Sequence, residues 1–230
     1  MFKKSIFFIL TFFVAVVMAA GAEAQKLNKD QILNGLSSKY RNIHGLQATY
    51  SRMASTPTTD QIFKTGSSQV ATGMLYWERP DKLLLDQASP DKETMVTDGR
   101  TVWWHIPSER LVYRYSNIDV AGQLKPLMSF LGGLNSLNAD FNVSLAPLDK
   151  ARPGQHGLIL LPKGGPDAGV ERLTVWCDNN FVLTGFSMTA ITGEVTDFYL
   201  TGFTENPNLA RSLFSFKVPK GVQVIEEDGN

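Results

Sequence analysis

From residue 45 almost to the end of the chain, short segments rich in Val, Thr, Tyr, Trp and Phe alternate with Gly, Asp, Asn and Pro. This texture is typical of antiparallel strands separated by turns. Between two such segments, Asp98-Gly99 indicates a two-residue hairpin, because both turn positions favour a positive φ. The predicted strands cover residues 46–53, 70–78, 82–87, 93–97, 101–105, 111–115, 140–145, 157–161, 172–176, 183–189, 195–201 and 213–218.

An amphipathic helix is predicted just before the first strand. Asn28 can cap its first turn, and Gln31 stands three residues later, where it completes a capping box. Apolar residues then recur at helical spacing, namely Ile32, Leu33, Leu36 and Tyr40. A stripe of this kind must cover another apolar surface.

A second short helix is predicted in the interruption between residues 118 and 138. Pro126 can open it, and Gly132-Gly133 can stop it. Its apolar residues are Leu127, Met128, Phe130 and Leu131. We expect this segment to lie on the sheet, as the first helix does.

The number of strands constrains the architecture. About eight strands already make a closed barrel that its own side chains fill, so a dozen imply a cavity or a strongly curved open sheet. The two helices are the available covers for the concave face. We therefore predict a mainly β fold, an incomplete antiparallel barrel whose helical lid encloses a hydrophobic cavity. Residues 55–68, residues 163–169 and the tail after Val224 are predicted to be disordered.

Strand alternation between residues 73 and 80 places Leu75 and Trp77 on one face. Glu78 lies on the other face and should meet water, so the Leu75 side should be concave. Leu83 and Leu85 continue the concave face after the next turn. Each of these four can contact a ligand or pack as ordinary core, and the sequence leaves both open.

Arg79 follows the same alternation and would point inward, at the rim of an apolar interior. An unpaired guanidinium there is costly, and its natural acceptors are the free carbonyls at the end of a covering helix. The alternative is that Arg79 lies just beyond the strand and reaches solvent.

The first 24 residues read as a secretory signal peptide. Lys3 and Lys4 precede an apolar run over residues 5–20, and Ala22-Glu23-Ala24 is a small-x-small cleavage site. An uncleaved membrane anchor is the alternative, but a spanning helix needs about 20 apolar residues. Cleavage would leave one domain, residues 25–230, with 20 basic and 21 acidic residues.

Charge and motifs exclude several functions. Lys and Arg total 22 and so do Asp and Glu, which disfavours a polybasic nucleic-acid binder. Motifs for phosphate binding, dinucleotide binding or hydrolysis are missing, and the three histidines are scattered. Cys177 lies in an apolar run, which indicates a buried, inert thiol. We predict neither enzyme activity nor a cofactor or metal site.

Four motifs in register resemble the LolA family of periplasmic lipoprotein carriers. They are Gly73-x-Leu75-Tyr76-x-x-Arg79-Pro80, then Val96-x-Asp98-Gly99-x-x-Val102-Trp103, then Pro107, and finally Phe214-x-Phe216-x-x-Pro219-x-Gly221-Val222-x-Val224. The resemblance implies an incomplete barrel of about eleven strands whose cavity takes lipoprotein acyl chains. It also implies that Arg79 hydrogen-bonds the lid and holds the empty carrier closed.

The resemblance further implies a monomeric shuttle that receives lipoproteins from an inner-membrane ABC transporter and passes them to the outer-membrane acceptor LolB. The residues expected to contact acyl chains are Leu75, Trp77, Leu83, Leu85, Ile32, Leu36, Leu127 and Met128. Two alternatives stay open: a lipid-binding module for sensing or for transport of another lipid or glycolipid, and an interaction protein with a filled core.

Overall fold

The computed structural model describes residues 27–55, 70–116, 124–133, 137–147, 153–166 and 169–227. The predicted signal peptide and residues 56–69 lie outside these ranges.

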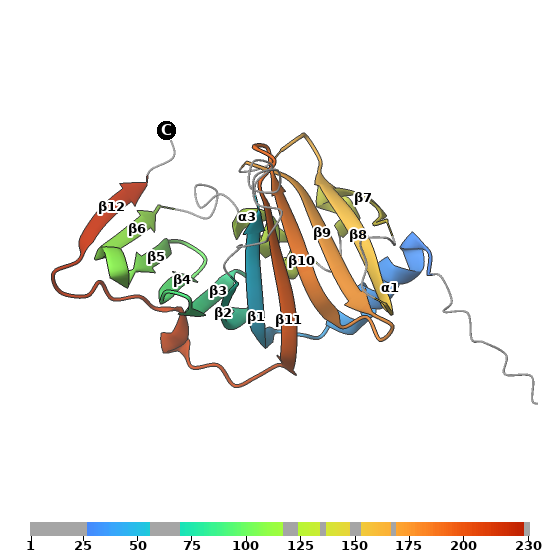
Figure 1. Ribbon diagram of the computed structural model, residues 1–230. Helices are drawn as coiled ribbons and strands as arrows, with labels where there is room; N and C mark the ends of the chain where they lie inside the picture. The colour runs from blue at the N-terminus through green and yellow to red at the C-terminus, as the bar shows by residue number, and fades with distance from the viewer. Residues whose placement is uncertain are drawn as a thin grey trace, which may run out of the picture.

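Twelve strands in the described residues form one sheet, in the order β12-β6-β5-β4-β3-β2-β1-β11-β10-β9-β8-β7. The order runs from one free edge to the other, so the sheet curls without closing (Figure 1). This confirms the predicted open, curved, mainly β architecture. The strands are β1 (Gly45–Ser55), β2 (Ala71–Glu78), β3 (Lys82–Ser89), β4 (Glu93–Thr97), β5 (Val102–Ile106), β6 (Leu111–Tyr115), β7 (Phe141–Leu145), β8 (Gln155–Pro162), β9 (Val170–Asp178), β10 (Leu183–Ala190), β11 (Val195–Glu205) and β12 (Gln223–Glu227).

The described residues form three α-helices, which lie against the part of the sheet that contains β7, β8 and β9: α1 (Lys29–Tyr40), α3 (Leu124–Gly132) and α4 (Leu137–Asp140). The predicted capping box is present, because Asn28 Oδ1 accepts from Gln31 N and Gln31 Oε1 accepts from Asn28 N, both at 2.9 Å. α3 starts two residues before Pro126. A proline is tolerated there because first-turn N–H groups have no helical acceptor. Within the described ranges, no helix combines the length and the apolar character needed to span a bilayer.

The inner face of the sheet carries the main core. β2 pairs with β3 so that Leu75 faces Leu85 and Trp77 faces Leu83, which confirms the predicted alternation. Ile32 on α1 belongs to the same continuous apolar cluster. The helices therefore cover the concave face, as the stripe on α1 predicted.

The segment after β11 crosses the outer face of the sheet (Figure 1). It forms the short helix η3 (Arg211–Phe214), which packs on β3, and Phe214 is buried there with Leu84 and Val96. The predicted strand over residues 213–218 is therefore wrong: Phe214 and Phe216 alternate to reach this outer cluster, not to pair in the sheet.

The final strand was missed by the sequence pattern. β12 overlaps the tail after Val224 that was predicted to be disordered, yet it pairs with β6 in parallel, from Gln223 opposite Leu111 to Glu227 opposite Tyr115. Arg114 and Glu226 form an ion pair of 2.6 Å across this pairing. Backbone pairing with a long-range partner thus decides the structure of a segment with little apolar content.

The β4–β5 connection is longer than the predicted two-residue hairpin. β4 ends at Thr97 and β5 begins at Val102, so four residues form the loop. Asp98 Oδ1 accepts from Arg100 N at 3.0 Å and Thr101 N at 3.1 Å, and only Gly99 of the two turn residues has a positive φ. The Asp98 side chain stabilises the longer loop by replacing backbone acceptors.

Candidate functional site

Arg79 joins the ends of two helices to the end of β2. Its Nε donates to Ile43 O at 2.8 Å, just after α1, and its Nη2 lies 3.4 Å from Tyr40 O, the last residue of α1. Its Nη1 donates to Gly132 O at 3.1 Å, at the end of α3. Carbonyls at helix C-termini lack intrahelical partners and carry partial negative charge, so a guanidinium is well matched to them.

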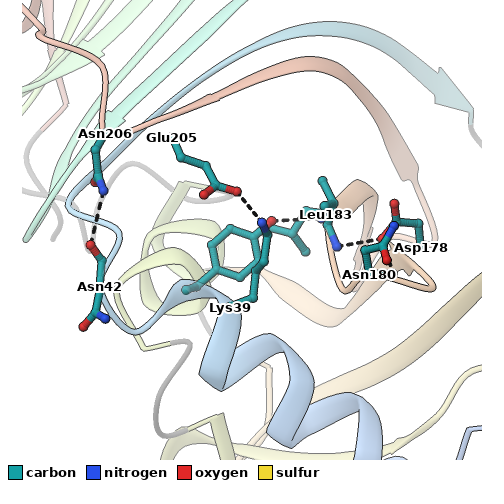
Figure 2. Close-up of polar contacts among 9 residues, drawn as sticks. Lys39, Asn42, Asp178, Asn180, Leu183, Glu205 and Asn206 are labelled. Atoms are coloured by element: carbon teal, nitrogen blue, oxygen red, sulfur yellow. Dashed lines mark hydrogen bonds and ion pairs between the residues drawn. The ribbon is translucent and has the colours of Figure 1, made fainter.

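Further contacts fix α1 to the sheet, as Figure 2 shows. Lys39 Nζ lies 2.6 Å from Glu205 Oε1 at the end of β11. Leu183 N donates to the buried Tyr40 hydroxyl at 2.9 Å. Burial raises the pKa of Tyr40 above its ordinary range, so the phenol stays neutral as the acceptor of this bond. Asn206 Nδ2 donates to Asn42 O at 3.3 Å, just beyond the helix.

The middle of α1 is also held closely. A Cβ added at Gly35 would overlap the Phe181 ring, so glycine permits this close approach. Among the side chains that the structure describes, Arg79 is the one that hydrogen-bonds the end of α3. α1 is thus tied at several points, whereas among the described side chains the polar attachment at the end of α3 is Arg79.

Trp77 lies under this junction. The Arg79 guanidinium carbon is 5.4 Å from the Trp77 ring centroid, a cation–π geometry. The indole is fully buried, and Nε1 has no hydrogen-bond partner within the described part of the chain. An unsatisfied buried donor costs about 1 to 3 kcal/mol, so the packing around Trp77 carries a local penalty.

The structure places the predicted acyl-chain residues in one continuous apolar cluster. Leu85 is partly buried, and the other seven are nearly inaccessible to solvent. These seven are Leu75, Trp77, Leu83, Ile32, Leu36, Leu127 and Met128. They pack against each other; of the eight, Leu85 lines the cavity described next, and Ile32 lines a second cavity of about 310 Å³.

The cavity lined by Leu85 has a volume of about 410 Å³ and lies on the concave face, next to the main core. Its volume lies within the range of small-molecule sites. The apolar wall comes from the sheet and continues the main core: Leu85, Met95, Val102, Met188 and Phe198. Tyr50, Trp104 and Tyr115 add aromatic surface to the same wall. An apolar group entering here would meet the packed core directly.

One side of the cavity is polar. Arg52 Nη2 donates to Gln87 Oε1 at 2.8 Å, and Gln87 Nε2 donates to Asp91 O at 2.9 Å. Trp104 Nε1 donates to Glu93 Oε2 at 3.1 Å. These bonds give the polar side chains fixed positions beside the apolar wall.

Sequence reasoning missed this polar side, although strand alternation contains a signal for it. In the register of β1 with β11, Tyr50 faces Leu200 and Arg52 faces Phe198, so both residues lie on the inner face. The pattern of β1 alone does not reveal which strand lies beside it. Trp104 points inward and Trp103 outward, as their adjacent positions on β5 predict.

The remaining candidate chemistry is inert in this structure. Cys177 is buried, and burial raises the pKa of its thiol to about 12, so it is a poor nucleophile. His156 is buried and its Nε2 lies 2.8 Å from Asn179 Oδ1. No set of three or more His, Cys, Asp or Glu side chains in the described ranges is arranged to hold a metal ion.

Comparison with known proteins identifies the family. The family described as "Outer membrane lipoprotein carrier protein LolA" matches residues 58–217. An outer-membrane lipoprotein carrier protein of Hahella chejuensis is 26% identical over 221 residues, covering 93% of this chain and 95% of the relative. One from Legionella pneumophila is 25% identical over 195 residues, covering 84% of this chain and 88% of the relative. A crystal structure of a LolA superfamily protein from Nitrosomonas europaea aligns with a TM-score of 0.44 and 11% identity, over 83% of this chain and 99% of that one. The chain belongs to the LolA family.

Proposed function

We propose that this protein carries lipoproteins across the periplasm by shielding their acyl chains on its concave face. The observation that carries the proposal is the combination of an apolar cavity with two helices whose ends meet at Arg79. The family match, and relatives named as outer-membrane lipoprotein carriers, support it. The role is binding and transfer, with no covalent reaction.

The energetic problem is the exposure of acyl chains to water. Each CH₂ contributes about 0.8 kcal/mol, so a chain of roughly fifteen carbons costs on the order of 12 kcal/mol in the aqueous phase. A cavity of about 410 Å³ provides the first part of a shielded site. Further room must come from separating the helices from the sheet, because Leu75, Trp77 and their neighbours already fill the core.

Arg79 acts as the latch in this mechanism. In the empty carrier it holds the ends of α1 and α3 against β2. Loading breaks part of this contact, so the loaded form is strained and onward transfer runs downhill. A carrier that gripped its cargo equally well at both membranes would not release it.

α3 is the element that we propose to move. When the Arg79 hydrogen bonds break, α1 keeps its contacts through Tyr40, Lys39 and Gly35. α3 buries Leu127 and Met128, and an acyl chain can replace their apolar contact with the sheet. The cargo then takes the place of the lid residues on the concave face.

The proposed cycle needs a partner at each membrane. We propose an inner-membrane lipoprotein-releasing ABC transporter as donor and LolB, or an equivalent protein, as acceptor. The carrier works as a monomer made of residues 25–230, after a signal peptide over residues 1–24 directs export and is removed.

Release of newly made lipoproteins from spheroplasts tests the proposal. The purified protein should bring lipoproteins into the soluble fraction as a one-to-one complex. Arg79→Leu should still bind cargo but deliver it poorly to outer membranes. Arg114→Leu is the matched control, because Arg114 also lies 5.4 Å from a tryptophan ring centroid, that of Trp103, but its partner among the described residues is Glu226 on β12 and not a helix end. Lipid binding without lipoprotein release would favour sensing or transport of another lipid, and the absence of lipid binding would leave a filled core.

A further inference from the structure

The polar side of the concave cavity is built from three strands of the same part of the sheet. Arg52 comes from β1, Gln87 from β3 and Glu93 from β4, and Gln87 and Glu93 are directly paired. Gln87 is only 5% exposed. Its amide is bonded at both ends, to Arg52 on one side and to Asp91 O on the other, so it holds the guanidinium in place.

Arg52 supplies hydrogen-bond donors to the cavity. A guanidinium has five N–H groups, and Gln87 accepts one of them. Arg52 lines the cavity beside Phe198, opposite it on β11. A ligand whose apolar part rests on Phe198 therefore has a cationic donor within reach of its polar end.

The charge of this polar side is not suited to an anion. Glu93 and Glu194 line the same cavity as Arg52, so two carboxylates accompany one guanidinium. Glu93 is fixed by the bond from Trp104 Nε1 and cannot swing away without losing it. In a partly desolvated site, a phosphate would be repelled by both carboxylates, whereas an uncharged carbonyl oxygen meets no such penalty.

We propose that this polar side selects the uncharged ester group of an acyl lipid and rejects lipids that carry a phosphate headgroup. The inference rests on the proposed acyl-binding function and identifies the ester as the group of the ligand that the cavity recognises. Arg52 donates to the ester carbonyl, Gln87 positions Arg52, and Glu93 and Glu194 oppose phosphate. A carrier that works between two phospholipid membranes would thereby avoid filling with membrane lipid.

Displacement of a fluorescent hydrophobic probe by three lipids with matched eight-carbon chains tests this inference. They are dioctanoylglycerol with ester carbonyls, dioctylglycerol with ether links, and dioctanoyl phosphatidylglycerol. We expect the ester to bind about tenfold more tightly than the ether, because the ester can accept one charge-assisted hydrogen bond that the ether cannot match. The phosphatidylglycerol should bind more weakly than dioctanoylglycerol by a similar factor.

Variants separate the two parts of the inference. Arg52→Leu should bring the ester-to-ether ratio close to one, whereas Arg52→Lys, which keeps a cationic donor, should retain part of the preference. The double variant Glu93→Gln with Glu194→Gln should bring the phosphatidylglycerol closer to dioctanoylglycerol. Glu171→Gln, an exposed carboxylate outside the cavity, is the control and should change neither ratio.

The outcomes are distinct. If ester, ether and phosphatidylglycerol all displace the probe equally well, the protein binds acyl chains but the inference is wrong. An ester preference that survives Arg52→Leu in a variant with an unchanged melting temperature would also overturn it. If none of the three lipids displaces the probe, the acyl-binding function itself fails.

Discussion

Replacing Arg79 by leucine should loosen α3 much more than α1. The substitution keeps an apolar stem but removes the guanidinium that bonds Gly132 O at 3.1 Å and Ile43 O at 2.8 Å. A hydrogen bond to a charged group is worth about 1.5 to 3 kcal/mol, and the half-buried position of Arg79 favours the lower end of this range. The contact to Tyr40 O, at 3.4 Å, is longer than an ordinary N–H···O bond and adds little.

The loss for α3 is therefore the Gly132 bond, about 1.5 kcal/mol, which corresponds to roughly a tenfold rise in the population of its open form. α1 loses the Ile43 bond but keeps the Tyr40 hydroxyl as acceptor for Leu183 N. It also keeps its close packing at Gly35. Ile43 lies beyond residues 29–40, so opening of the helix itself does not require this bond to break, and the population of its open form should change by less than about threefold.

Native-state hydrogen exchange measures both helices in one experiment, through peptides that cover residues 29–40 and 124–132. Arg114→Leu is the control, since its ion pair with Glu226 is partly exposed and such pairs contribute at most about 1 kcal/mol. Unchanged exchange of α3 in Arg79→Leu would refute the latch. Equal acceleration of α1 and α3 would refute the assignment of α3 as the moving part.

Three further predictions concern buried groups. Tyr40→Phe removes the acceptor of Leu183 N and should lower the free energy of unfolding in urea by about 1 to 3 kcal/mol; a value near zero would mean that water replaces the hydroxyl. Burial raises the pKa of Tyr50 to about 12. An unfolded tyrosine ionises near 10, so unfolding releases a proton above that pH, and the urea midpoint should fall between pH 10 and 12; in Tyr50→Phe this part of the fall should be missing. Cys177, buried and with its thiol pKa raised to about 12, should resist alkylation at pH 8 in the native protein and react after denaturation; rapid native labelling would contradict its burial.

The local pattern of apolar and polar residues was sufficient to predict those helices and strands that bury one face. Alternation around Leu75 and Trp77 identified the inner face of β2, and the Asn28–Gln31 capping box located the start of α1. In both cases neighbours in sequence determine the structure. The type of partner that Arg79 binds, the free carbonyls at the end of a helix, was also predictable, because an inward-pointing arginine needs hydrogen-bond acceptors.

The predictions failed where contacts between segments far apart in the sequence determine the structure. Phe214 and Phe216 alternate like strand residues, but they pack on the outside of β3 and β5, whose position no local pattern reveals. The polar side of the cavity depends on the lateral order of strands, which brings Arg52 and Gln87 into contact. Periodicity reports which face a residue occupies, but not which residues share that face from other strands.

The parallel pairing of β12 with β6 also affects how the chain finishes folding. β12 follows the other eleven described strands along the chain, and until it pairs, the backbone groups of β6 form an open edge. Open edges pair readily with other chains. Once in place, β12 presents exposed Gln223 and Glu226 at that edge, and an acidic side chain discourages further pairing. β12 thus protects the folded molecule from joining its sheet to that of another copy.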